Sequence, residues 1–221
     1  MVFFRVVEKA EAQLVACLKW RTEFKVAELN PDMFELEAST GKLYRHGFDK
    51  TGRPVLYMKP RLENTKNWDN QLRHTVYHLE RTVESMDPAR GVESWVFIMD
   101  FSGHSLSTSA PMSLARQILD IISTSYPERL GLSVMVDTPF FFSLFWGAIS
   151  PFVPPVTKAK VKFCSSPRNG YKLDPSFSNN FDDLDDLESD FGGTKTYEYD
   201  HQVYWDNERQ NLSKLKKVTE A

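Results

Sequence analysis

The side chains best suited to chemistry in this chain are histidines near carboxylates and hydroxyls. His74 and His78 are four residues apart, so on a helix both imidazoles share one face and can hold a metal ion. Position 75 is a threonine, which rules out the His-Glu-x-x-His motif of zinc proteases. We therefore predict a solvated helix face here and no metal site.

His104 is the second candidate, because it follows Asp100 and precedes Ser105 just beyond an expected strand, where α/β proteins often bind ligands. A catalytic triad nevertheless needs partners that converge in space, and neighbours in one turn do not provide them. The ten glycines also form no nucleophile elbow, dinucleotide fingerprint or phosphate-binding loop. We predict no catalytic residue, no enzymatic activity and no cofactor.

Size and composition indicate one domain with a large apolar interior. The chain has 221 residues, 41 % of them apolar, and its 16 Phe and five Trp suit a large core or an apolar cavity. The net charge of −3 gives no general attraction to nucleic acid. Any attraction to an anionic membrane must therefore come from a local patch.

Cysteine usage and the N-terminus favour a cytoplasmic location. Cys17 and Cys164 each lie in an apolar pattern, so we expect free thiols in a reducing compartment. The apolar run at residues 1–5 is too short for a signal peptide.

A stretch of 20 residues without charge, from Thr138 to Thr157, meets the length of a membrane span. Pro151, Pro154 and Pro155 would break a spanning helix. We therefore predict a helix over residues 140–149 that is apolar on every side yet belongs to a soluble domain.

Strands and helices alternate along the chain, which predicts an α/β fold with a mostly parallel sheet. The expected helices cover residues 7–24 and 70–86, and a third opens at residues 109–111. The expected strands cover residues 43–44, 54–58, 94–100, 132–137 and 160–164. We further predict a surface loop at 178–190, a closing strand at 194–205 and a mobile charged tail from 212 to 221.

Five motifs in order carry a family resemblance. They are Asp49-Lys50-Thr51-Gly52-Arg53-Pro54-Val55, Met99-Asp100-Phe101-Ser102-Gly103, Tyr126-Pro127-Glu128-Arg129-Leu130-Gly131, Ser150-Pro151-Phe152 with Val156-Thr157 and Lys160, and Asp190-Phe191-Gly192-Gly193. Together they span residues 42–193 and resemble the CRAL-TRIO lipid-binding domain of Sec14-like transfer proteins. The resemblance implies a sheet that floors a hydrophobic lipid pocket, with helices and a mobile gate helix covering it.

The N-terminal part departs from this pattern. Residues 8–21 resemble the last helix of the family's N-terminal helical module, whose earlier helices have no counterpart here, and the usual basic lead-in is shortened to Phe3-Phe4-Arg5. We therefore do not assign Arg5 the headgroup role of a basic residue in some members. The expected divisions are a remnant module at 1–30, the lipid-binding domain at 31–205 and a tail at 206–221.

The resemblance also implies site residues. Trp95, Phe97 and Met99 alternate on one sheet face and are expected to line the pocket, although both faces of that strand can simply be core. The expected gate helix carries Phe140, Phe141, Phe142, Leu144, Phe145 and Trp146, with a rigid core helix as the alternative.

For the headgroup, the matching positions are Glu128, Thr157 and Lys160, a set that suits an inositol phosphate. The alternatives are an exposed strand face of alternating lysines and a surface ion pair between Glu128 and Arg129.

The function expected from this resemblance is binding of one phospholipid, with phosphatidylinositol first, and its transfer at membranes. The protein is expected to be a monomer that touches membranes transiently and binds no nucleic acid. Two alternatives stay open: a carrier of a sterol-, tocopherol- or retinoid-like ligand, and a regulatory protein-interaction module without lipid exchange.

Overall fold

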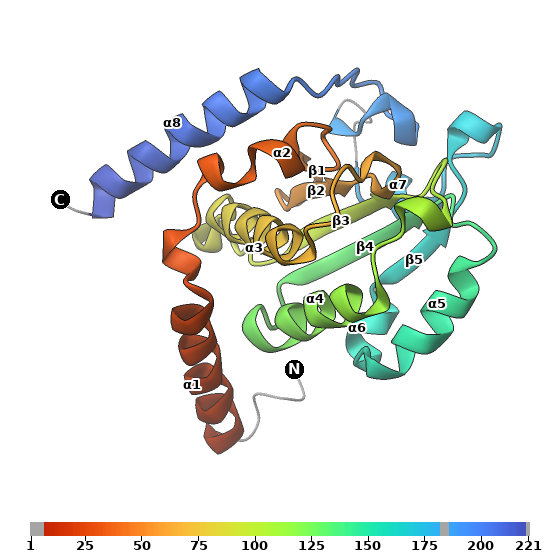
Figure 1. Cartoon of the computed structure of the whole chain (residues 1–221). Coiled ribbons are helices and arrows are strands. Elements are labelled where there is room, and N and C mark those ends of the chain that lie inside the picture. The colour runs from red at the N-terminus through yellow and green to blue at the C-terminus, as the bar shows by residue number, and fades with distance from the viewer. Residues whose placement is uncertain (1–6, 182–185, 220–221) are drawn as a thin grey trace.

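Five strands form one mixed sheet, in the order β1-β2-β3-β4-β5, in the computed structural model, which describes residues 7–181 and 186–219 (Figure 1). The strands are β1 (Leu43–Phe48), β2 (Pro54–Met58), β3 (Trp95–Asp100), β4 (Leu130–Val136) and β5 (Val161–Cys164). β1 and β2 are antiparallel, and every other neighbouring pair is parallel. The predicted α/β fold with a mostly parallel sheet is confirmed.

The turn between β1 and β2 is fixed by one carboxylate. Asp49 accepts hydrogen bonds from the backbone amides of Thr51 and Arg53, and its second oxygen accepts one from the Arg53 guanidinium at 2.7 Å. Because an Asp side chain can satisfy amides two or more residues ahead, this sequence reverses the chain tightly.

Eight α-helices lie among the described residues, and those between residues 68 and 159 connect the parallel strands. The eight helices are α1 (Val7–Phe24), α2 (Glu35–Ala38), α3 (Trp68–Glu84), α4 (Met112–Ser125), α5 (Phe142–Ile149), α6 (Pro155–Ala159), α7 (Pro175–Ser178) and α8 (His201–Thr219). Figure 1 shows α3, α4 and α5 along the same side of the sheet. We call this side of the sheet the helix face and the opposite side the closed face.

The side chains at the centre of the closed face are buried. Val55, Tyr57, Val96, Ile98 and Val134 lie on it, and each is fully buried. Aromatic residues from the C-terminal half cover it: the ring of Phe191 stacks on Tyr57 at 5.5 Å, and Phe177 packs beside Phe191.

The predicted surface loop at residues 178–190 is only partly on the surface. Residues 182–185 lie outside the described part of the chain, but Phe181, Leu187 and Glu188 on either side of them are buried. Glu188 accepts a hydrogen bond from the hydroxyl of Tyr44 at 2.9 Å, so this segment is attached to β1.

The predicted closing strand at residues 194–205 is wrong, because α8 begins at His201. Aromatic residues at alternating positions 197 and 199 produced the strand-like pattern, but their rings pack on Tyr44 rather than extending the sheet. Tyr204, Trp205 and Glu208 then follow helical spacing and are buried against α3 and β1. The helix therefore crosses the expected boundary between residues 205 and 206. The tail expected to be mobile from residue 212 is helical as far as Thr219, and residues 220 and 221 lie outside the described part.

α1 is the helix expected from residues 7–24, but it buries none of its side chains completely. It contacts α4 and α3 through polar groups: Gln13 donates to the backbone of Ser123, and Arg21 forms two hydrogen bonds with Glu80. Leu14 and Leu18, expected on the packed face, are more than half exposed. The motif at residues 3–5 lies outside the described part of the chain.

Candidate functional site

The three expected headgroup residues come together at one edge of the sheet. Glu128 lies in the turn two residues before β4, and Lys160 directly precedes β5. Since β4 and β5 are parallel neighbours, with Ser133 paired to Val161, their amino ends meet at the same edge. Thr157 lies in the short helix α6 that leads into β5, and its carbonyl accepts a hydrogen bond from the amide of Lys160.

Lys160 points toward Glu128 rather than into solvent. Its Nζ donates to the carbonyl of Leu130 at 2.7 Å and lies 3.7 Å from Oε2 of Glu128. The Lys160 side chain is 25 % exposed and that of Glu128 49 %, so their mutual attraction is weak and the ammonium remains accessible to an anion. Arg129 turns away and donates to the carbonyl of Glu93, so the alternative Glu128–Arg129 pair is not the ion pair formed here.

Glu128 has an unusual backbone. Its φ of 61° lies in the left-handed region, which costs a non-glycine residue about 1–2 kcal/mol. Such strain often accompanies functional positions, and here it aims a carboxylate at the edge of a groove. The groove, of about 470 Å³, runs between α1 and the α4–β4 turn and is also lined by Gln13, Glu80 and Tyr126.

The helix face of the sheet is less tightly covered than the closed face. Phe97 and Met99 lie on the central strand, yet both keep part of their surface exposed, whereas Val96 and Ile98 on the opposite face keep none. A central strand shows exposed side chains only where no element packs directly on them. Trp95 differs from the other two expected lining residues, because it is 1 % exposed and packs against Tyr126 at the end of α4.

α5, the expected gate helix, covers one end of this face. Phe142 is buried against Phe101 and Met135, and Phe145 and Trp146 pack around the same cluster. Phe141 is half-buried near His104. Leu144 of α5 faces outward at 79 % exposure, and Phe140, in the turn before the helix begins at Phe142, is 91 % exposed. The predicted all-round apolar helix thus has one packed side and one side that presents large apolar groups to the surroundings.

No helix in the described ranges has both the length and the apolar character needed to cross a membrane. The uncharged stretch predicted not to span one is divided among α5, a 3-10 turn at Ser150–Phe152, and α6.

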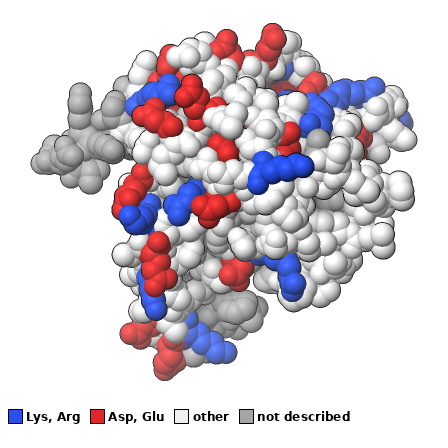
Figure 2. Space-filling view, viewed as in Figure 1, with Lys and Arg blue, Asp and Glu red and all other residues white. Residues whose placement is uncertain are grey.

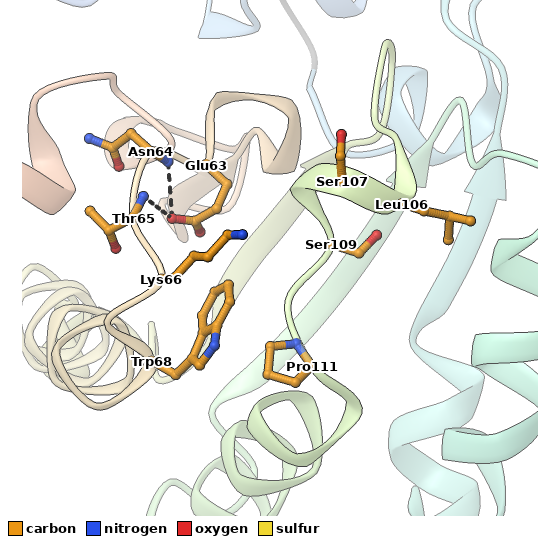
Figure 3. A pocket seen from close by; sticks show the side chains of 9 residues that line it. All are labelled: Glu63, Asn64, Thr65, Lys66, Trp68, Leu106, Ser107, Ser109 and Pro111. Atoms are coloured by element: carbon orange, nitrogen blue, oxygen red, sulfur yellow. Dashed lines mark hydrogen bonds between the residues drawn. The ribbon is translucent and has the colours of Figure 1, made fainter.

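A second hollow, of about 640 Å³, lies at the opposite, carboxyl edge of the sheet (Figure 3). The side chains of Lys66 and Trp68 border it on one side and Leu106, Ser107 and Ser109 on the other. Its carboxylate, Glu63, is already occupied, because it accepts hydrogen bonds from Lys42 and Gln71 as well as from the amides of Asn64 and Thr65. None of the expected headgroup, gate or lining residues borders this hollow.

Asp100, in the predicted turn after β3, is a structural anchor. Its side chain is fully buried, and its oxygens accept hydrogen bonds from Arg61 at 2.7 Å and Arg168 at 2.9 Å. Burial alone would raise the pKa of this carboxyl, but the bonds from Arg61 and Ser102 and the charge of Arg168 outweigh it and lower the pKa. The motif marked Asp100 in the sequence, but its two arginine partners lie 39 and 68 residues away and carry no signal of their own.

The prediction of a solvated face at His74 and His78 is wrong. Both side chains are buried, and their Nε2 atoms lie 3.1 Å apart beneath Trp205 of α8. The periodicity of α3 was correct, but the sequence did not show that α8 would cover this side. Within residues 7–181 and 186–219, no group of three or more His, Cys, Asp or Glu side chains is placed to hold a metal ion.

His104 lies next to a hydroxyl, as its turn suggested: Ser109 Oγ is 2.9 Å from its Nε2. Asp100 is committed to the two arginines, so the three residues do not form a relay. Cys17 and Cys164 are both free and half-buried, and burial raises the pKa of Cys164 to about 12.

Comparisons with known proteins agree with this fold. The family model described as the CRAL/TRIO domain matches residues 38–193. A CRAL-TRIO domain-containing protein of Schizosaccharomyces pombe is 36 % identical over 199 residues, which cover 90 % of this chain and 18 % of that protein. The phosphatidylinositol transfer protein PDR17 of Saccharomyces cerevisiae is 31 % identical over 204 residues, covering 87 % of this chain and 55 % of the relative.

Two further similarities are more distant. The SEC14 cytosolic factor of Candida glabrata is 29 % identical over 172 residues, covering 70 % of this chain and 57 % of the relative. The crystal structure of Sfh5 superposes with a TM-score of 0.57 at 18 % identity, covering 69 % of this chain and 59 % of that one, which supports the fold alone.

The fold and the family match place this molecule among the α/β proteins built on a sheet with one loosely covered apolar face. The chain belongs to the CRAL/TRIO domain family. It spans between 18 % and 55 % of the length of the first two relatives described above, so it corresponds to only part of those proteins.

Proposed function

We propose that this chain binds one phospholipid against the helix face of the sheet, with phosphatidylinositol as its ligand, and transfers or presents it at membranes. The observation that carries the proposal is the convergence of Glu128, Thr157 and Lys160 at an accessible edge of that sheet. An ammonium supplies a point charge for a phosphate, and the carboxylate accepts hydrogen bonds from inositol hydroxyls. The name of the PDR17 relative, a phosphatidylinositol transfer protein, supports the same ligand class.

The acyl chains need an apolar space, and the partly exposed Phe97 and Met99 on the helix face suit one; Met99 packs next to Phe142 of α5. In this proposal α5 is the gate: closed, it covers the chains, and open, it presents Phe140 and Leu144 to the bilayer surface. The carrier acts without catalysis and without a cofactor other than its lipid. It works in the cytoplasm, in line with the name of the SEC14 cytosolic factor, as a monomer that meets membranes transiently.

The first test is native mass spectrometry of the purified protein with identification of the bound lipid. We expect one phosphatidylinositol per chain. The Lys160→Ala variant should lose most of it, while Lys172→Ala, which removes an exposed lysine from the loop after β5, should keep it. A stoichiometric lipid that Lys160→Ala leaves unchanged would refute the headgroup site but keep the carrier.

The second candidate is a carrier of a bulkier hydrophobic ligand. Trp95 and Phe97 are bulky and apolar, which disfavours a small polar headgroup site on this strand. A sterol- or isoprenoid-like compound found in the same mass spectrum would favour this alternative. A protein that stays empty after incubation with mixed vesicles, and that moves no fluorescent lipid between them, would instead favour a regulatory protein-interaction module.

A further inference from the structure

Charge is unevenly distributed along this chain. Residues 138–173 contain no Asp or Glu and five basic residues, so this stretch carries +5. Because the whole chain carries −3, the rest of it carries −8. A molecule with this polarity is turned by a negatively charged surface so that one side faces it.

Two of the five cations are used internally. Arg168 turns back to Asp100, and Lys160 lies at the headgroup site beside Glu128. Lys158 and Lys162 are exposed, on α6 and β5 respectively. Lys160 therefore belongs to the candidate site, whereas Lys158 and Lys162 are exposed to solvent.

Exposed apolar side chains precede these two lysines in the chain. Phe152 is 62 % exposed and Val156 is 47 % exposed. A further cation from α4 reaches the same place, because the Arg116 guanidinium lies 4.1 Å from the centroid of the Phe152 ring. Figure 2 shows the surface over the neighbouring α5 free of charged side chains, with basic side chains bordering it beside α6.

The support beneath Phe152 and Val156 is rigid. Val153 is 6 % exposed and attaches the turn to the core. Pro151, Pro154 and Pro155 restrict the backbone on either side of it. The apolar groups are thus held outward by a fixed turn, whereas the outward groups of α5 belong to the element proposed to move.

We infer that residues 150–162 form a membrane anchor, separate from the gate helix, that docks this chain on a bilayer containing anionic lipid. Residues 150–162 contain large apolar side chains followed by lysines and no Asp or Glu, a composition that matches an interfacial anchor whose apolar groups insert while ammonium groups meet lipid phosphates. Thr157 lies between the anchor residues Val156 and Lys158, so docking would bring the candidate headgroup site to the bilayer surface. This inference deepens the proposed function by naming the partner surface, and it can hold or fail independently of lipid carriage.

The test is flotation of the full chain with vesicles of phosphatidylcholine, with and without phosphatidylserine. We expect binding only when phosphatidylserine is present, and we expect it to weaken with added salt. Each exposed lysine should contribute about fivefold to the binding constant, so Lys158→Gln/Lys162→Gln should weaken binding roughly thirtyfold. The matched control, Lys9→Gln/Lys66→Gln, removes the same charge from exposed positions elsewhere and should have little effect.

Phe152→Ala should also weaken binding, whereas Val203→Ala, at an equally exposed apolar position on α8, should not. Equal binding to both vesicle types, or equal losses in the lysine pair and its control, would overturn the anchor. A dimer in sedimentation velocity that Phe152→Ala abolishes would overturn it too, because it assigns this surface to a second copy.

Lipid loading separates the anchor from the proposed function. Lys158→Gln/Lys162→Gln should retain its bound lipid in native mass spectrometry while losing vesicle binding. An empty wild-type protein that still binds phosphatidylserine vesicles would refute lipid carriage and keep the anchor. A wild-type protein that carries lipid, but whose vesicle binding does not depend on these lysines, would refute the anchor and keep lipid carriage.

Discussion

His74 and His78 couple the stability of this protein to pH. Burial lowers the pKa of His74 to about 3 and also lowers that of His78, with neighbouring positive charge as the smaller cause. Each histidine therefore binds fewer protons in the folded chain than in the unfolded chain, where its pKa is about 6.5. Stability contributed by such groups is complete above the unfolded pKa and is lost as the pH falls below it.

We expect the free energy of unfolding to decrease from about pH 6.5 downward, with a slope that approaches about 1.4 kcal/mol per pH unit for each histidine. Urea unfolding at a series of pH values measures this slope. The His74→Leu/His78→Leu variant should have a flatter profile, and His201→Leu, which changes a half-buried histidine of α8, should keep the wild-type slope. An unchanged slope in the double variant would contradict the assignment.

A comparison of alanine substitutions at Gly192 and Gly91 distinguishes the cost of backbone strain from the cost of steric crowding. Both have a positive φ, of 93° and 77°, but a Cβ at Gly91 would meet nothing within 4 Å. A Cβ at Gly192 would lie 3.0 Å from the ring of Pro167 and 2.8 Å from Leu173, and the proline ring cannot rotate away.

We therefore expect Gly91→Ala to cost about 1 kcal/mol from strain alone, and Gly192→Ala to cost about 1–3 kcal/mol more. Chemical denaturation of both variants measures the difference. Equal losses would mean that the loop around Gly192 adapts without cost.

At the scale of elements, α8 is part of the folded domain rather than an appendage. Trp205 is 1 % exposed, stacks on Tyr77 of α3 at 5.5 Å and donates through Nε1 to the hydroxyl of Tyr199. One turn further along, Glu208 forms a 2.7 Å ion pair with Arg45 of β1 and accepts a hydrogen bond from the hydroxyl of Tyr77. Side-chain contacts therefore attach two successive turns of α8 to the domain.

Trp205→Ala should lower the free energy of unfolding by about 3–5 kcal/mol, because it leaves a large cavity between α8 and α3. Val203 lies on the same helix at 59 % exposure, so Val203→Ala should change the free energy of unfolding by about 0.5 kcal/mol or less. Urea unfolding followed by circular dichroism compares the two. Similar small losses in both variants would show that α8 is dispensable for the core.

At the scale of the whole molecule, long-range contacts join its two ends. Tyr44 of β1 bonds to Glu188, and Arg45 next to it pairs with Glu208, so segments separated by more than 140 residues share one core. Of the three described helices α1, α3 and α4, only α1 has no buried side chain.

We expect a single cooperative unfolding transition, with the same midpoint by tryptophan fluorescence and by far-ultraviolet circular dichroism. Among the long helices, α1 should show the fastest hydrogen exchange before the main transition. A helical signal that disappears before the fluorescence change, with rapid exchange in the amides of α8, would mean that α8 melts independently of the sheet.

The sequence by itself determined the local elements and their order. Amphipathic spacing located α3, continuous apolar runs located β3 and β4, and Asp49 fixed the first turn, because these signals depend on neighbours only a few residues away. The family resemblance implied that Glu128 and Lys160 share one site, and the structure brings their side chains to 3.7 Å from each other.

Only the tertiary structure decided which surfaces are covered. The burial of His74 and His78, the helix in place of a strand after residue 200, and the two arginines on Asp100 all depend on partners far along the chain. An alternating aromatic pattern or a polar helix face has the same local energy whether water or another helix lies against it. The packing of α8 supplied that missing partner, and periodicity within any short window of the sequence contains no record of it.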